Sequence, residues 1–308
     1  MIRRQKKLAA YFLALTVFTS YVMLDTFVIT RVYGVEDASD ADQTEIVAED
    51  AAGTANEEAG EPVITADSYS DGNINIRMSE YTVNDTAVYL AEVSLVSPEY
   101  LKTAFAQEAY GRNVTETTSD IADSVNAILA INGDFYGTQE KGYVIRNGVL
   151  YRNEGSADRE DLVIYGDGSF EIISEGEVSA EQLLENGAVQ TLSFGPALVE
   201  EGEISVGLNE EVGRAMASNP RTAIGIKADG TYLLTVSDGR TDESEGLSLY
   251  ELAEFMQSMG AVTAYNLDGG GSSTMVFNGT VVNDPTGGRA GHGSGSERSV
   301  SDIVYIGY

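Results

Sequence analysis

Cysteine is absent from this chain of 308 residues, and histidine occurs only once. Without cysteine the protein can form no disulfide bond, thiolate nucleophile or zinc–thiolate site. A single histidine also excludes a site in which several histidines bind one metal ion. These absences remove three common kinds of site, and they suit an exported protein.

Basic residues are scarce as well. The chain has 18 Lys and Arg against 49 Asp and Glu, a formal net charge of −31. Residues 77–308 alone contain 36 acidic and 13 basic residues. We therefore expect no nucleic-acid partner, because proteins bind phosphate backbones through basic patches. The few arginines that lie inside glycine-rich motifs become more informative for the same reason.

The longest apolar run lies at the N-terminus. Basic residues at positions 3, 4, 6 and 7 precede a hydrophobic stretch from Leu8 to Leu24. This order predicts a membrane segment over residues 1–35, either a retained signal-anchor with a cytoplasmic basic end or a signal peptide cleaved after Gly34. We favour the anchor. In both cases the rest of the chain is extracytoplasmic, either anchored to the membrane or secreted.

The next segment, residues 36–76, contains twelve acidic residues and no basic ones. A segment of this composition cannot bury enough apolar surface to offset the entropy that ordering costs, so we expect a disordered acidic linker. This linker would hold the folded domain, residues 77–308, away from the membrane.

The domain alternates short strand patterns with turns. Pairs of Asn, Asp and Gly predict hairpin turns at 84–85, 147–148, 166–168, 229–230 and 278–279. Helices are expected at about 98–109, 118–128 and 248–259, the last beginning with a capping box of Ser248 and Glu251. Elements in this order predict a single α+β domain with a mixed or antiparallel sheet and a few helices.

The stretch "YNLDGGGSST", residues 265–274, places Asp268 between a predicted buried strand and three glycines. Glycine accepts positive φ and lets other groups approach the main chain closely, so this loop suits a carboxylate that faces a ligand. The amides of residues 270–273 can point at an anion as a nest. Taken alone, such a stretch is also typical of a turn between two strands.

Other polar clusters occur at predicted strand ends. They are "AINGDFY" (130–136), "NPRTAIG" (219–225), "SDGR" (237–240) and "SERSVSD" (296–302). Singly, each is typical of a turn or a surface ion pair. Together with "FGPALVEEGEI" and "GAVTAYNLDGGGSSTM", in order from about residue 125 to the C-terminus, they resemble the phosphodiester glycosidase family, whose bacterial relatives include exported proteins related to exopolysaccharide.

The resemblance implies hydrolysis of a sugar joined through its anomeric carbon to a phosphodiester. Breaking that bond builds positive charge on the sugar, and Asp268 is expected to stabilise the charge or to attack the carbon. Glu297 or Asp238 is expected to position water as the general base. Relatives commonly have glycine where this chain has Asp134, which gives that residue no expected catalytic role.

Phosphate is already a good leaving group, so binding its negative charge matters more than protonating it with a general acid. Arg221, Arg240 and Arg298 are expected to bind this charge, because a guanidinium fork matches phosphate geometry. The expected substrate-binding set also includes Asn132, Thr222, Asn266, Gly269, Gly270, Gly271, Ser272 and Ser273.

No cofactor is required by this chemistry, although a calcium ion held by Asp134, Asp238, Asp268 and Asp302 stays open. We expect His292 to lie in a solvated glycine-rich loop, 287–296, rather than to transfer protons. Two functions remain beside a glycosidase acting on glycosyl-phosphate groups of an envelope or extracellular glycan. One is a noncatalytic module that binds or assembles phosphate-bearing envelope polysaccharide, and the other is an adhesion domain that uses calcium.

Overall fold

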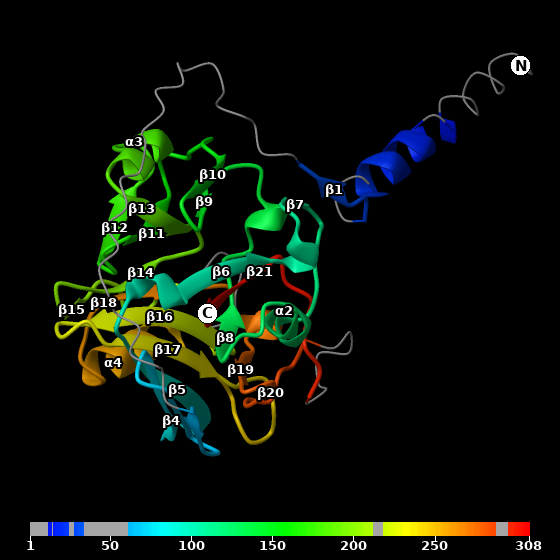
Figure 1. Cartoon of the computed structure of the whole chain (residues 1–308). Helices are drawn as coiled ribbons and strands as arrows, with labels where there is room; N and C mark the ends of the chain where they lie inside the picture. The colour runs from blue at the N-terminus through cyan, green and yellow to red at the C-terminus, as the bar shows by residue number, and fades with distance from the viewer. Residues whose placement is uncertain (1–11, 14, 25–27, 34–60, 212–217, 288–294) are drawn as a thin grey trace, which may run out of the picture.

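The computed structural model describes residues 12–13, 15–24, 28–33, 61–211, 218–287 and 295–308 (Figure 1). Within these ranges no helix has both the length and the apolar character needed to cross a membrane. Much of the predicted membrane segment and most of the predicted linker lie outside the described residues, as does His292.

Two antiparallel sheets form most of the domain. The larger has nine strands in the order β15 (Glu203–Ile204), β14 (Ala197–Glu200), β18 (Ala261–Asn266), β16 (Arg221–Lys227), β17 (Tyr232–Ser237), β5 (Thr86–Leu95), β4 (Ile74–Val83), β3 (Ser68–Ser70) and β2 (Val63–Ile64). The smaller has five in the order β20 (Thr280–Val281), β19 (Met275–Phe277), β8 (Leu129–Asn132), β21 (Asp302–Ile306) and β6 (Leu101–Phe105).

Smaller sheets complete the structure. A three-stranded sheet runs β12 (Phe170–Ser174), β11 (Glu160–Tyr165) and β13 (Ala188–Leu192), and β9 (Val144–Arg146) pairs with β10 (Val149–Arg152). Near the N-terminus, β1 (Arg31–Val32) pairs with β7 (Gly111–Arg112). The helices of the domain are α2 (Thr118–Ser124), α3 (Ala180–Glu185) and α4 (Leu249–Ser258), and residues 15–24 near the N-terminus are also helical. Short 3-10 turns lie at Pro98–Tyr100, Ala106–Glu108, Tyr136–Thr138 and Gly270–Ser272.

The main core lies between the sheets. Ile76 and Leu234 of the large sheet belong to the same buried cluster as Ile131 and Val304 of the small sheet and Leu162 of the three-stranded sheet. The helices cover outer faces, α4 the large sheet, α2 the small sheet and α3 the three-stranded sheet (Figure 1). A main buried cluster that joins the three sheets, with smaller clusters under the helices, therefore supports a single sheet-rich domain with few helices, as the sequence predicts.

The hairpin and capping predictions are confirmed. Each predicted turn joins a pair of strands: β4–β5, β9–β10, β11–β12, β16–β17 and β19–β20. Asn84, Asp85, Asn147 and Asn278 have positive φ, as tight hairpin turns require. At the start of α4, the Glu251 amide donates to Ser248 Oγ over 3.2 Å and the Ser248 amide donates to the Glu251 carboxylate over 2.8 Å.

The helix predicted at 98–109 is wrong. This stretch contains two short 3-10 turns on either side of β6, which pairs along its length with β21 near the C-terminus. Pairing with a distant strand outweighs local helix propensity here, and positive φ at Gln107 and Glu108 ends the extended segment. The helix predicted at 118–128 ends earlier, at Ser124, and α3 was not predicted.

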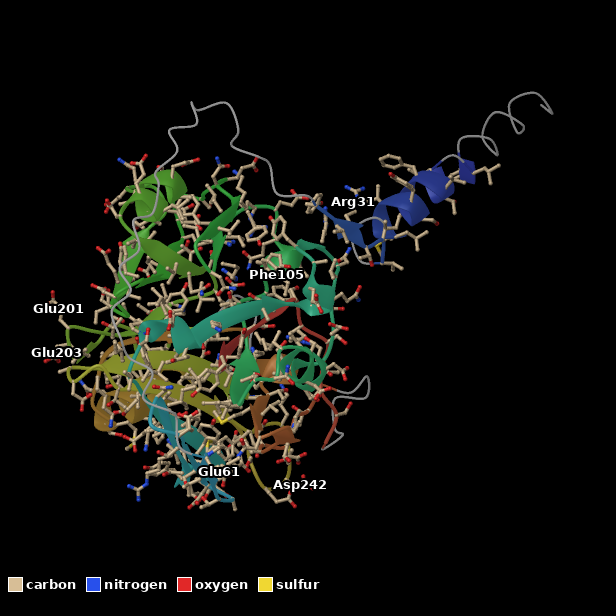
Figure 2. The ribbon with its side chains drawn as sticks, in the orientation of Figure 1. Arg31, Glu61, Phe105, Glu201, Glu203 and Asp242 are labelled. Atoms are coloured by element: carbon tan, nitrogen blue, oxygen red, sulfur yellow. The ribbon has the colours of Figure 1, made fainter. Side chains whose placement is uncertain are left out.

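The predicted linker, 36–76, is wrong at its C-terminal end. Strands β2, β3 and the first residues of β4 lie inside it, and Tyr69, Ile74 and Ile76 are buried in the main core. Apolar residues at alternate positions give these strands a face to bury despite the nearby acidic residues. Acidic side chains elsewhere, such as Glu61 and Asp242, lie at the perimeter of the domain (Figure 2).

A buried ion triad joins the small sheet to β9. The Arg146 guanidinium lies 3.0 Å from Asp134 Oδ2 and 2.8 Å from Asp302 Oδ2, and all three residues are almost completely buried. Asp134 also accepts the Ser193 amide at 2.7 Å and the Tyr136 amide at 3.0 Å. Asp134 is thus a structural residue, in keeping with its lack of an expected catalytic role.

Replacing Arg146 by Met should lower the free energy of unfolding by about 3–5 kcal/mol, because two buried carboxylates would lose their shared cation. The matched control is Lys227→Met, which breaks the half-exposed pair with Glu92 and should cost about 1 kcal/mol or less. Urea denaturation of both variants gives the comparison. A loss for Arg146→Met no larger than that of the control would contradict the structural role of the triad.

Candidate active site

Asp268 lies in the loop between β18 and β19, and its side chain is 11% exposed. Its Oδ2 accepts a hydrogen bond from Ser272 Oγ at 2.6 Å and one from Arg298 Nη2 at 2.9 Å. Among the described residues, none donates to Oδ1. One carboxylate oxygen is therefore fixed in position while the other stays open to a ligand.

Burial raises the pKa of Asp268, and the positive charge of Arg298 together with the Ser272 hydroxyl opposes that rise. The carboxylate therefore holds its proton at higher pH than an exposed aspartate. A desolvated carboxylate beside a guanidinium is the environment in which a nucleophile or a stabiliser of developing positive charge is most effective.

The loop itself is held from two sides. The Asn132 side chain, at the end of β8, donates to the Asp268 carbonyl over 2.6 Å, and the Gly270 amide donates to the Pro220 carbonyl over 2.7 Å. Asn132 Oδ1 accepts the Thr222 hydroxyl at 2.8 Å and the Thr274 amide at 3.2 Å. Asn132 and Thr222, both predicted to bind substrate, are fully buried and instead position the loop.

Two of the three predicted arginines lie beside this loop. The Arg298 side chain is 43% exposed, and it contacts Ser272 as well as Asp268. Arg240 has positive φ, and Asn219 Oδ1 orients its guanidinium by accepting from Nη2 at 2.7 Å. An added Cβ on Gly270 would lie 3.0 Å from Arg240 Nη2. Glycine at 270 therefore allows the guanidinium to approach the loop backbone.

Arg221 is placed differently. Its backbone runs next to Gly269, but its guanidinium is buried, donates to the Leu247 carbonyl over 2.8 Å and pairs with Glu211. Burial lowers the pKa of Arg221, and the charge of Glu211 opposes that change. A carboxylate already neutralises Arg221 in this structure, and its role as a phosphate anchor stays a prediction.

Among the described residues, neither predicted general base forms a hydrogen bond or an ion pair with Asp268. Glu297 accepts the Ser119 backbone amide at 3.1 Å and also bonds the Ser119 hydroxyl, so it caps the first turn of α2. Asp238 accepts Asn283 Nδ2 at 3.2 Å and the Asp284 amide at 2.8 Å. Burial raises the pKa of Asp238, and these two donors oppose the rise.

The other predicted residues form the walls of the loop. Ser272 bonds Asp268, Ser273 lies 3.2 Å from the Thr222 hydroxyl, and the Asn266 side chain donates to the Gly195 carbonyl over 2.7 Å. Gly269 and Gly271 complete the turn, and Gly271 packs against Gly287 and Arg298. Sequence reasoning missed Asn219 and Asn283. Asn219 begins the motif "NPRTAIG", whereas Asn283 lies outside the quoted motifs, and only their hydrogen bonds reveal their roles.

The candidate calcium ligands are not gathered. No group of three or more acidic or histidine residues in the described part of the chain is arranged to hold a metal ion. Asp134 and Asp302 already share the Arg146 cation, so their oxygens do not form an open ligand set.

The sequence of this chain was compared with models of known protein families. The profile of the phosphodiester glycosidase family, NAGPA, matches residues 125–307 and so includes every residue of the site described above. The chain belongs to the phosphodiester glycosidase family.

Two relatives show the extent of the sequence similarity. The N-acetylglucosamine-1-phosphodiester alpha-N-acetylglucosaminidase of Mus musculus is 34% identical over 187 residues, which are 55% of this chain and 35% of that protein. The SPbeta prophage-derived uncharacterized protein YomE of Bacillus subtilis is 30% identical over 204 residues, 65% of this chain and 31% of that protein. The chain therefore matches only about a third of the length of these relatives.

Solved structures support the fold. The catalytic domain of the zebrafish N-acetylglucosamine-1-phosphodiester alpha-N-acetylglucosaminidase, auto-inhibited by its pro-peptide, aligns with a TM-score of 0.59 at 24% identity, covering 76% of this chain and 83% of that one. A hypothetical protein from Synechocystis aligns with a TM-score of 0.54 at 14% identity, covering 76% and 62%. Both share the sheet-rich architecture of the phosphodiester glycosidase domain described here.

Gly270→Ala should weaken binding of a sugar-1-phosphodiester about tenfold or more, which corresponds to about 1.4 kcal/mol, because the new methyl group displaces the Arg240 guanidinium. Gly279→Ala is the matched control: Gly279 also has positive φ, at +73° against +62° for Gly270, but no atom lies within 4 Å of the added Cβ. Calorimetric titration measures both affinities. Equal affinities in the two variants would show that binding does not depend on the position of the Arg240 guanidinium beside Gly270.

Proposed function

We propose that this protein hydrolyses a glycosyl-1-phosphodiester and releases the free sugar and a phosphomonoester. The observation that carries the proposal is the Asp268 carboxylate, with Oδ2 held by Arg298 and Ser272 and Oδ1 open, in a loop that Arg240 also borders. Family membership supports the same reaction class.

In this proposal the acidic residue acts on the sugar and the arginines bind the phosphate. Asp268 stabilises the positive charge that develops on the sugar ring or attacks the anomeric carbon, since an open carboxylate oxygen suits both roles. Arg298 and Arg240 hold the phosphate, whose two oxygens match guanidinium donors. The Arg298 side chain is 43% exposed and contacts Asp268, so it can serve both the carboxylate and the incoming phosphate.

The setting of the reaction is part of the proposal. The basic and apolar N-terminal sequence supports an extracytoplasmic protein, anchored or secreted, that acts on an envelope or extracellular glycan. The relatives' names support N-acetylglucosamine as the first sugar to test. Since the charges of the reaction are met by Asp268, Arg240 and Arg298, we propose that turnover needs no metal cofactor.

Asp268→Asn should reduce turnover about 10²-fold or more, because the neutral amide neither attacks nor stabilises positive charge well. The test uses the purified full chain and a synthetic diester of α-N-acetylglucosamine 1-phosphate, with EDTA present and free sugar measured. The control is Asp242→Asn, which changes an exposed acid at the perimeter and should turn over normally. Both variants should melt at the temperature of the unchanged protein.

Two outcomes would count against this assignment. Full activity in Asp268→Asn would remove that residue from the chemistry. Saturable binding of the diester with no sugar released by the unchanged chain would favour the noncatalytic module instead.

The acid side of the pH profile tests the state of Asp268. Because burial raises its pKa, kcat/KM should fall with decreasing pH at a higher pH than an ordinary aspartate, about 3.9, would give. Arg298→Met removes the positive charge that opposes this rise, so the fall should move to still higher pH. Lys227→Met, which removes an equal charge elsewhere, should leave the profile in place. A shift to lower pH in Arg298→Met would contradict the proposed pairing.

A further inference from the structure

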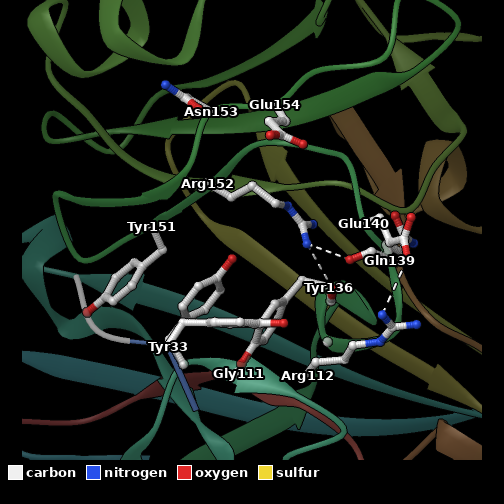
Figure 3. Close-up of a pocket in the computed structure, with 12 residues that line it drawn as sticks. Tyr33, Gly111, Arg112, Tyr136, Gln139, Glu140, Tyr151, Arg152, Asn153 and Glu154 are labelled. Atoms are coloured by element: carbon white, nitrogen blue, oxygen red, sulfur yellow. Dashed lines mark hydrogen bonds and ion pairs between the residues drawn. The ribbon is translucent and has the colours of Figure 1, made fainter. Parts of the chain in front are cut away.

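A cavity of about 610 Å³ lies between the β9–β10 hairpin and strand β7. Four tyrosines line it, Tyr33, Tyr110, Tyr136 and Tyr151. Its charged lining residues are Arg112, Arg152, Glu140 and Glu154, and Arg112 pairs with Glu140 at 3.3 Å. Figure 3 shows tyrosine rings on one side of the cavity and the Arg152 side chain reaching across toward Gln139. No residue of the Asp268 loop lines this cavity.

The tyrosine rings form a packed surface. Tyr110 and Tyr136 stack with ring centroids 5.3 Å apart and 17° between planes, and Tyr151 lies 5.1 Å from Tyr110. Phe105 packs behind them, 5.2 Å from Tyr136 and 5.0 Å from Tyr151. Flat rings held rigidly in this way present broad apolar faces at little entropic cost, which suits the C–H face of a sugar ring.

The Arg152 guanidinium, which lines this cavity, bonds backbone carbonyls instead of a carboxylate. It donates to three backbone carbonyls, those of Gly142 at 2.6 Å, Gln139 at 2.7 Å and Tyr136 at 3.2 Å. No carboxylate of the described residues forms an ion pair with it, although the chain has 49 acidic residues against 18 basic ones. Burial also lowers its pKa. The charge of Asp134 is among those that oppose this change without forming an ion pair. A partly desolvated cation that forms no ion pair favours an anionic ligand.

Two nitrogens of these arginines lack acceptors. Arg152 Nη2 and Arg112 Nε are buried and have no hydrogen-bond partner. Tyr110 is the nearest candidate for Arg152: burial raises the pKa of Tyr110 and the charge of Arg152 opposes that rise, but the contact falls short of hydrogen-bond geometry. Buried donors in folded proteins are nearly always satisfied by protein or by water, so donors of this kind beside a cavity can bond an oxygen of a ligand that enters it.

We propose that this tyrosine-lined cavity binds a sugar unit that carries an anionic group, a carboxylate or a phosphate. The sugar ring packs on Tyr110 and Tyr151, and the anionic group reaches Arg152. Gln139 and Asn153, which also line the cavity, supply amide groups for hydroxyls. Binding here does not depend on turnover at Asp268, so the cavity holds a part of a glycan that is not being cleaved.

Calorimetric titration of the purified full chain tests this site. The probes are a disaccharide of galacturonic acid, galactose 6-phosphate and a neutral galactose disaccharide. At least one anionic probe should bind about tenfold or more tighter than the neutral one, and Arg152→Met should remove that advantage. The two anionic probes separate a carboxylate from a phosphate preference. Tyr151→Ala should weaken all three probes, whereas Tyr165→Ala, which changes a tyrosine outside the cavity, should weaken none.

Further variants keep the result decisive. If Arg152→Met unfolds, Arg152→Lys takes its place; it keeps the charge but loses the guanidinium fork, so it should reduce the same advantage. Arg298→Met should leave the advantage of the galacturonic acid disaccharide unchanged, because Arg298 lies at the Asp268 loop. The proposal is overturned if the anionic and neutral probes bind equally, if no probe binds, or if the anionic advantage survives undiminished in a folded Arg152 variant.

Discussion

The candidate active site depends on one buried side chain, that of Asn132. Its amide group donates to the Asp268 carbonyl and accepts from Thr222 and Thr274, so it joins the end of β8 in the small sheet to β16 in the large sheet and to both ends of the glycine loop. An amide has both a donor and an acceptor, which these three partners require together. The two sheets thus meet at a fixed point, and the position of Asp268 follows from it.

The buried ion triad of Asp134, Arg146 and Asp302 also supports the end of β8. Gly133 donates to the Asp302 carbonyl over 2.9 Å and accepts the Asp268 amide at 3.3 Å, and Asp134 and Asp302 share Arg146. The loop that carries Asp268 is therefore supported by rigid polar contacts rather than by its own glycines. A catalytic carboxylate benefits from such support because its geometry must be held closely while the glycines leave space for a ligand.

The sequence predicts what is local and misses what depends on distant partners. Hairpin turns are encoded by two or three neighbouring residues, such as Asn147 and Gly148, and those predictions are correct. Strand β6 was assigned to a helix because its partner, β21, lies about two hundred residues away in the sequence. At the site, Asp268 and Arg298 were found through motifs. Glu297 is next to Arg298 but reaches α2, and Arg221 is neutralised by Glu211, neither of which spacing alone can reveal.

The acidic surplus of the chain also acts at the borders of the nine-stranded sheet. Both border strands, β2 and β15, are only two residues long, and glutamates lie in or beside them, Glu61 at one border and Glu201 and Glu203 at the other (Figure 2). Unpaired backbone groups at a sheet border invite pairing with another molecule, and short, negatively charged borders discourage it. The acidic residues that disfavour nucleic-acid binding therefore also disfavour pairing between the edge strands of this sheet and those of another copy of the protein.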